Sequence, residues 1–317
     1  MKITRRDFLK ASAAITGALT LKASGLMQLQ EAMAGGEGAP PVIWLQGQGC
    51  TGCSVSLLNS TYYMTIDQLL IDTLDVKYHP TVMAAAGEMA VEAAETAREA
   101  GGYVLVIEGA IPVGEGGHYC HLWEDADGNP VTMQQAVESF APNAIAILAI
   151  GTCACYGGMS AGEPNPTEAM GVDDALAYLA LEVDAPVINI PGCPAHPDWI
   201  VGTVAALLAG EMPELDDYGR PKDFYGSCVH EKCPNRALDR TARTLGETGC
   251  LAGLGCRGQQ THADCPIRQW NSAGQGETGV NWCIGSRNPC QGCTEPDFPD
   301  GMSPFYNLEG RTGDKPV

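Results

Sequence analysis

The stretch AIAILAI at residues 144–150, followed at once by Gly151, Thr152 and Cys153, decides the fold of this 317-residue chain. An unbroken apolar run of this length that ends in glycine is typical of a strand buried on both faces of a parallel sheet. In open α/β sheets, ligands bind just beyond the carboxyl ends of the strands. The stretch therefore predicts a parallel sheet with a thiol at its carboxyl edge.

Similar apolar runs alternate with helical patterns along the first two thirds of the chain. We predict further strands at residues 42–45, 103–107 and 186–190, and a weaker one at 75–79. Helices are predicted at residues 88–100, 133–139, 173–181 and 199–208. Buried strands that alternate with helices indicate a doubly wound parallel sheet. We therefore expect an α/β domain of this class over residues 35–212.

The composition of the chain changes at about residue 213. From there on Gly, Pro, Asn and Cys dominate, and apolar runs are few. Such a segment has little core of its own, and metal binding can supply part of its folding free energy. Residues 213–317 are therefore expected to form a second, irregular, cysteine-rich domain.

The first 34 residues have the features of an export signal. A twin-arginine start at residues 4–10 precedes a weakly apolar run, Ala11 to Leu21, and a small-residue cleavage motif, Ala32-Met33-Ala34. We expect the mature chain to begin at Gly35 and to reside in the periplasm. The twin-arginine route carries folded proteins, often with cofactors inserted, which suits clusters built in the reducing cytoplasm.

The chain is strongly acidic, with a formal net charge of -20 and a pI of about 4.5. Removing the signal, which holds five cations and two anions, would leave -23. This charge disfavours nucleic-acid binding and fits a partner with a basic docking face, although a solubilising acidic surface explains it equally well. Beyond the signal, no stretch reaches the roughly 18 apolar residues of a membrane span, and the polar segment from Glu309 to Val317 predicts no tail anchor.

Thiols follow three of the predicted strands. Cys50 and Cys53 come after the first strand, Cys153 after the strand at 144–150, and Cys193 after the last one. Because the carboxyl ends of parallel strands meet at one edge of a sheet, we expect these four thiols to lie close together.

A denser group of thiols lies in the last third of the chain. Six cysteines fall within the 44 residues from Cys250 to Cys293, and His230 and Cys233 precede them. An even count of fourteen in an exported chain permits disulfides. The Cys-x-x-Cys pairs have zinc-ribbon spacing but lack a matching second pair. Thiolates that come from irregular loops are typical of iron–sulfur clusters, and several clusters in one chain indicate an electron relay.

The motifs around these cysteines resemble those of the nickel–iron hydrogenase small subunit, in order and at compatible spacing from Arg5 to Tyr306. The resemblance implies a flavodoxin-like N-terminal domain and a cluster-rich C-terminal domain. The matching motifs are Cys50-Thr51-Gly52-Cys53, Gly151-Thr152-Cys153-Ala154, Pro191-Gly192-Cys193-Pro194, His230-x-x-Cys233, Cys250, Leu254-Gly255-Cys256, Cys265-Pro266, Asn281-Trp282, Pro289-Cys290-x-x-Cys293 and Ser303-Pro304-Phe305-Tyr306.

Carried over residue by residue, the resemblance implies three [4Fe-4S] clusters. The ligands of the proximal cluster would be Cys50, Cys53, Cys153 and Cys193. Those of the medial cluster would be Cys265, Cys283, Cys290 and Cys293. Those of the distal cluster would be His230, Cys233, Cys250 and Cys256.

Four positions differ from patterns found in parts of the family. Most members have proline where this chain has Cys283, and their medial cluster has three irons. A fourth thiolate would complete a four-iron cluster and lower its reduction potential, as in the nickel–iron–selenium subclass; the alternative is a small buried hydrophobe. Gly52 and Gly158 stand where oxygen-tolerant relatives have extra cysteines, so an ordinary proximal cluster is expected. Val55 replaces a frequent glutamate, and no proton-path role is assigned to it.

The other thiols and histidines receive no ligand role. We expect buried free thiols at Cys120, Cys155 and Cys228. His118 and His121 flank Cys120 in a metal-like pattern that lacks a fourth partner. Flavin is not expected, because cysteines occupy the strand-end loops.

The resemblance implies the electron-transferring small subunit of a periplasmic hydrogenase. Hydrogen would be split at a nickel–iron centre in a separate large subunit, and the N-terminal cysteine loops would face that subunit in a large, obligate interface. Electrons would enter at the proximal cluster and leave from the distal one to a basic multihaem c-type cytochrome. The alternatives are an iron–sulfur subunit of another respiratory oxidoreductase and a non-enzymatic secreted disulfide protein.

Overall fold

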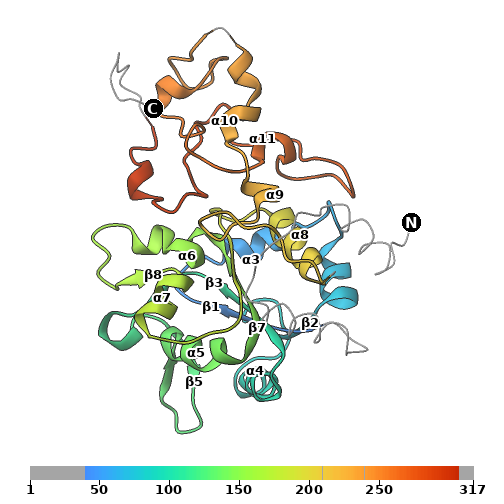
Figure 1. Ribbon diagram of the computed structural model, residues 1–317, viewed down its shortest axis with the longest axis vertical. Coiled ribbons are helices and arrows are strands. Elements are labelled where there is room, and N and C mark those ends of the chain that lie inside the picture. Colours follow the sequence, from blue (N-terminus) through green and yellow to red (C-terminus); the bar gives the residue numbers. More distant parts are fainter. Residues whose placement is uncertain (1–39, 209, 239, 307–317) are drawn as a thin grey trace.

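The computed structural model describes residues 40–208, 210–238 and 240–306, so the predicted export signal and mature start lie outside it. A five-stranded parallel sheet forms the centre of the first part (Figure 1), in the order β2-β1-β3-β7-β9. This order is the flavodoxin-like one, and the predicted fold class is confirmed. The strands are β1 (Pro41–Gln46), β2 (Asp75–Tyr78), β3 (Tyr103–Glu108), β7 (Ala144–Ile150) and β9 (Val187–Ile190).

Each predicted strand is present, with bounds that shift by one residue at most. Side chains of alternate residues point to opposite faces of a sheet, and both faces are buried. On one face Ile43, Leu105 and Ile147 pack with α4 (Glu88–Ala100), α5 (Met133–Phe140) and α7 (Val172–Tyr178). On the other face Trp44 and Leu148 pack with α8 (Pro197–Leu208).

Two helices differ at their ends from the prediction. Helix α7 ends at Tyr178 and not at Leu181, because Ala180 has a left-handed backbone (φ 50) and Leu181 N–H folds back to Leu176 O. Helix α8 begins two residues early, at Pro197, where proline fits because the first turn needs no N–H donor.

Several short elements were not predicted. Two of them, α3 (Gly52–Leu57) and α6 (Gly151–Tyr156), begin directly in the cysteine motifs after β1 and β7. They are too short to show a helical period. Further short elements are the π-helix η1 (Gln68–Thr73), the pair β4 (Ile111–Pro112) and β8 (Ala169–Met170), and the hairpin β5 (His121–Glu124) and β6 (Pro130–Thr132). Six short 3-10 helices, η2 to η7, complete the described elements.

The last third of the chain is irregular, as predicted, and forms the orange-to-red part of Figure 1. Its α-helices are single turns: α9 (Lys222–Tyr225), α10 (Val229–Lys232) and α11 (Cys265–Arg268). Its buried side chains, among them Tyr225, Leu251 and Trp282, join the core that covers the α8 face of the sheet. The segment therefore shares a core with the first part instead of building its own.

Replacing Ile147 by alanine should lower the free energy of unfolding by about 2–5 kcal/mol, because it leaves a cavity behind an interior strand. Ile147 is fully buried on β7. Denaturant unfolding of the purified protein measures the loss. The matched control is Ile71→Ala on η1, where 80% of the residue is exposed and the expected change is within about 0.5 kcal/mol. Equal losses in the two variants would contradict the assigned core.

Candidate iron–sulfur sites

The first set of thiols, Cys50, Cys53, Cys153 and Cys193, gathers at the carboxyl edge of the sheet. Cys50 lies just before α3, Cys53 lies in its first turn, Cys153 lies in α6, and Cys193 follows β9. Burial raises the pKa of Cys193 to about 11, although part of this residue reaches solvent, and the charges of Cys153 and Cys50 add to the increase. Burial also raises the pKa of Cys53, and the charges of Cys153 and Cys193 add to the increase, so the four thiols lie near one another, as the strand ends predict.

Backbone shape makes room for these sulfurs. Gly151 has φ 84, and a Cβ atom added there would overlap Cys53 Sγ. Gly158 has φ 50, and an added Cβ would lie 2.8 Å from the backbone nitrogen of Cys153. A side chain at either position would therefore push against the first set.

A buried carboxylate that the sequence reasoning missed holds α3 in place. Glu108, the last residue of β3, is 4% exposed. Its Oε1 accepts the backbone N–H groups of Cys53 (3.0 Å) and Ser54 (3.1 Å). Its Oε2 accepts Trp44 Nε1–H (3.1 Å), Gln46 Nε2–H (3.0 Å) and the Ser54 hydroxyl. An acidic residue that ends an otherwise apolar strand is the signal that could have revealed it.

The second set, Cys265, Cys283, Cys290 and Cys293, lies in the last third of the chain. Burial raises the pKa of Cys265 well above its usual range, and the charges of Cys293 and Cys290 add to the increase. The charge of Cys283 also raises the pKa of Cys265. Cys283 is exposed, which disfavours the alternative of a small buried hydrophobe.

The third set consists of His230, Cys233, Cys250 and Cys256. Burial raises the pKa of Cys256, and the charges of Cys250 and Cys233 add to the increase. His230 lies in α10, and Cys233 follows that single turn as its C-cap residue, with its backbone N–H donating to His230 O. Its backbone N–H donates to Gly258 O (2.8 Å), two residues beyond Cys256.

The second set touches both of the others. The backbone N–H of Cys290 donates to Cys256 Sγ of the third set (3.3 Å). Burial raises the pKa of Cys293, while a hydrogen bond from the backbone of Cys193, in the first set, opposes the increase. The three sets are therefore arranged in series, with the second in the middle.

The spacing of the thiols bears on what they could hold. Zn–S bonds are about 2.3 Å long, so the ligands of one zinc ion crowd within about 4 Å of each other. In the part of the chain that the structure describes, no three His, Cys, Asp or Glu side chains are arranged to hold a single ion. All fourteen cysteines fall in that part, and none is in a disulfide. Thiols gathered in sets from irregular loops are typical of iron–sulfur ligands.

The remaining thiols and histidines are packed in other ways. Cys155 is buried as predicted, and its Sγ lies 3.2 Å from Ala149 O. Cys120 and Cys228 are only half-buried, so the prediction was wrong in that respect. The facing ring nitrogens of His118 and His121 lie 3.4 Å apart, without a third ligand among the described residues.

Family models match three parts of the chain. The model of twin-arginine signal sequences matches residues 2–22, that of the NADH ubiquinone oxidoreductase 20 Kd subunit residues 50–207, and that of the C-terminal region of the NiFe/NiFeSe hydrogenase small subunit residues 225–306. The small subunit of the periplasmic [NiFeSe] hydrogenase of Desulfomicrobium baculatum is 44% identical over 98% of this chain and 100% of its own length. This chain belongs to the small-subunit family of [NiFe] and [NiFeSe] hydrogenases.

Other similar proteins belong to the same family. The periplasmic [NiFe] hydrogenase small subunit of Solidesulfovibrio fructosivorans is 38% identical over 96% of this chain and 93% of its own length. Solved [NiFeSe] hydrogenases of Desulfomicrobium baculatum and Desulfovibrio vulgaris Hildenborough have TM-scores of 0.79 and 0.77, at 45% and 46% identity. They cover 84% and 86% of this chain, which covers 98% of each.

The predicted periplasmic location and twin-arginine signal are confirmed, and the hydrogenase small subunit has an electron-transfer role. The alternatives of another respiratory oxidoreductase and of a secreted disulfide protein are set aside. None of the helices in the described ranges has the length and apolar character needed to cross a bilayer.

Replacing Glu108 by glutamine should lower the free energy of unfolding by about 1–3 kcal/mol, because an amide NH₂ cannot accept the buried donors that now point at the carboxylate. Denaturant unfolding of the cluster-loaded protein measures the loss. Glu92→Gln on the exposed side of α4 is the matched control, with an expected change within about 0.5 kcal/mol. Unchanged stability of the Glu108 variant would contradict its anchoring role.

Proposed function

We propose that this hydrogenase small subunit holds three [4Fe-4S] clusters, one on each set of ligands. The first set would hold the proximal cluster, the second the medial cluster and the third the distal cluster. The serial arrangement of the three sets carries this proposal, since the second set contacts both others. When bound, such clusters supply one-electron redox chemistry and would relay electrons between the hydrogen-splitting site of the large subunit and an external acceptor.

The large subunit would cover the first set of thiols in an obligate heterodimer. Large apolar side chains are exposed beside these thiols: Val55 (56%) and Leu58 (43%) at α3, and Met159 (55%), whose backbone N–H bonds to Cys153. Exposed apolar side chains grouped around a functional site are typical of a surface that a partner covers. A large interface of this kind is typical of permanent complexes.

The electron acceptor proposed on the resemblance is a multihaem c-type cytochrome. The net charge of -20 supports a partner with a basic docking surface. We also propose that the signal peptide spans residues 1–34, and that the two domains span residues 35–212 and 213–317.

Cys283 is proposed as the fourth ligand of the medial cluster. It is exposed, and its charge adds to the increase that burial causes in the pKa of Cys265, Cys290 and Cys293. A small apolar residue in a core would have neither property. With four thiolates the medial cluster would be of the four-iron type.

Replacing Cys283 by proline should convert the medial cluster to a three-iron form and raise its reduction potential, because one thiolate is lost. EPR of the oxidised heterodimer measures the three-iron signal, and a redox titration measures the potential. Cys120→Ser is the matched control, since Cys120 lies outside all three sets and should leave both readouts unchanged. An unchanged four-iron spectrum in the Cys283 variant would refute the assignment.

A further inference from the structure

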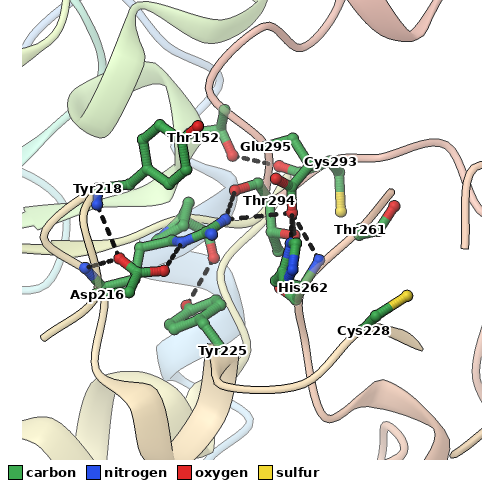
Figure 2. A network of polar contacts seen from close by, with 12 residues as sticks. Thr152, Asp216, Tyr218, Tyr225, Cys228, Thr261, His262, Cys293, Thr294 and Glu295 are labelled. Atoms are coloured by element: carbon green, nitrogen blue, oxygen red, sulfur yellow. Dashed lines mark hydrogen bonds and ion pairs between the residues drawn. The ribbon is translucent and has the colours of Figure 1, made fainter. Parts of the chain in front are cut away.

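The first and second sets of thiols meet at one buried side chain, Thr152, which precedes Cys153 in α6 and is 1% exposed. Its hydroxyl donates to the backbone oxygen of Cys293 and accepts the backbone N–H of Gly192 at 2.9 Å. Its own backbone N–H donates to Gly192 O at 3.0 Å. Figure 2 shows Thr152 directed at Cys293, with a dashed line joining them.

The hydroxyl thus joins three segments that each carry a proposed ligand, the helix α6 and two loops. Thr152 precedes Cys153, Gly192 precedes Cys193, and Cys293 belongs to the second set. A hydroxyl has one hydrogen to donate, and here it goes to Cys293 while Gly192 N–H fills an acceptor position. The direction of both hydrogen bonds is therefore fixed.

A separate contact holds the chain just after Cys293. The buried guanidinium of Arg220 donates to Thr294 O (3.1 Å) and to Glu295 Oε1 (3.1 Å), and its Nε donates to Asp216 Oδ2 (2.7 Å). Arg220 anchors the loop to the segment after β9, whereas Thr152 connects it directly to the loops of the first set.

We propose that Thr152 is a positioning residue that fixes the spacing between the first and second thiol sets. Building on the proposed function, this spacing sets how fast an electron passes between the proximal and medial clusters, because electron-transfer rates fall steeply with separation. One electron moves, and no bond or proton is exchanged. Without the hydroxyl, the buried Gly192 N–H and the half-buried Cys293 C=O lose this partner, and unpaired polar groups in such a place favour a shift of the loops.

The test uses three variants of the complete heterodimer. Thr152→Val removes the hydroxyl at nearly constant shape, and Thr152→Ser keeps it. Thr203→Val is the control for losing any buried hydroxyl, since Thr203 is equally buried (1%) and donates to Trp199 O (2.7 Å) within α8. The iron and acid-labile sulfide content of each variant is measured first, to establish that its clusters are assembled. EPR of the reduced samples then measures the magnetic splitting between neighbouring clusters, and freeze-quenching after mixing with H₂ measures the time course of their reduction.

Thr152→Val is expected to change the splitting and to slow reduction of the medial and distal clusters several-fold relative to the proximal one. Thr152→Ser and Thr203→Val should match the wild type. The inference is overturned if Thr152→Val has the same magnetic splitting and the same time course of reduction as the wild type. If the wild type also holds three clusters, the proposed function stands. A wild type without iron overturns the proposed function itself. If Thr152→Val assembles no clusters, Thr152→Ser decides: an altered splitting despite the retained hydroxyl overturns the inference.

Discussion

The structure depends on the convergence of parallel strands at one edge of a sheet. Because β1, β7 and β9 run in the same direction, their carboxyl ends bring thiols from three distant parts of the chain together. Both faces of the sheet are buried under apolar side chains, which holds the sheet between two packed layers. Glu108, at the end of the strand between β1 and β7, adds a second constraint by fixing the start of α3.

The last third of the chain builds on this edge. It has few regular elements, and its buried side chains complete a core that begins on the sheet. In place of regular secondary structure, the segment is held by contacts at the thiol sets. Examples are the hydrogen bond from Cys290 N–H to Cys256 Sγ and the one from the Thr152 hydroxyl to Cys293 O. A segment ordered in this way gains stability from whatever its thiols bind. Binding of metal clusters and folding of this segment are therefore expected to be coupled.

The sheet could be predicted from sequence because each strand is a local apolar run with a turn signal after it. The convergence of Cys50, Cys153 and Cys193 followed from strand direction alone. The contacts of Thr152 and Glu108 could not be predicted in the same way, since they join residues up to 141 positions apart and depend on how loops pack. The end of α7 was missed because Ala180, a good helix former, adopts a left-handed backbone. In the last third no local period exists, and the ligand sets there rested on resemblance.

The central claim is that three thiol-rich sets in series each hold a four-iron cluster. The most direct measurement is iron and acid-labile sulfide in the purified wild-type heterodimer, with EPR of the oxidised sample. We predict about twelve irons beyond the active-site iron and no three-iron signal. About eleven irons with a three-iron signal would contradict the assignment of the middle set, and absence of iron would contradict the electron relay as a whole.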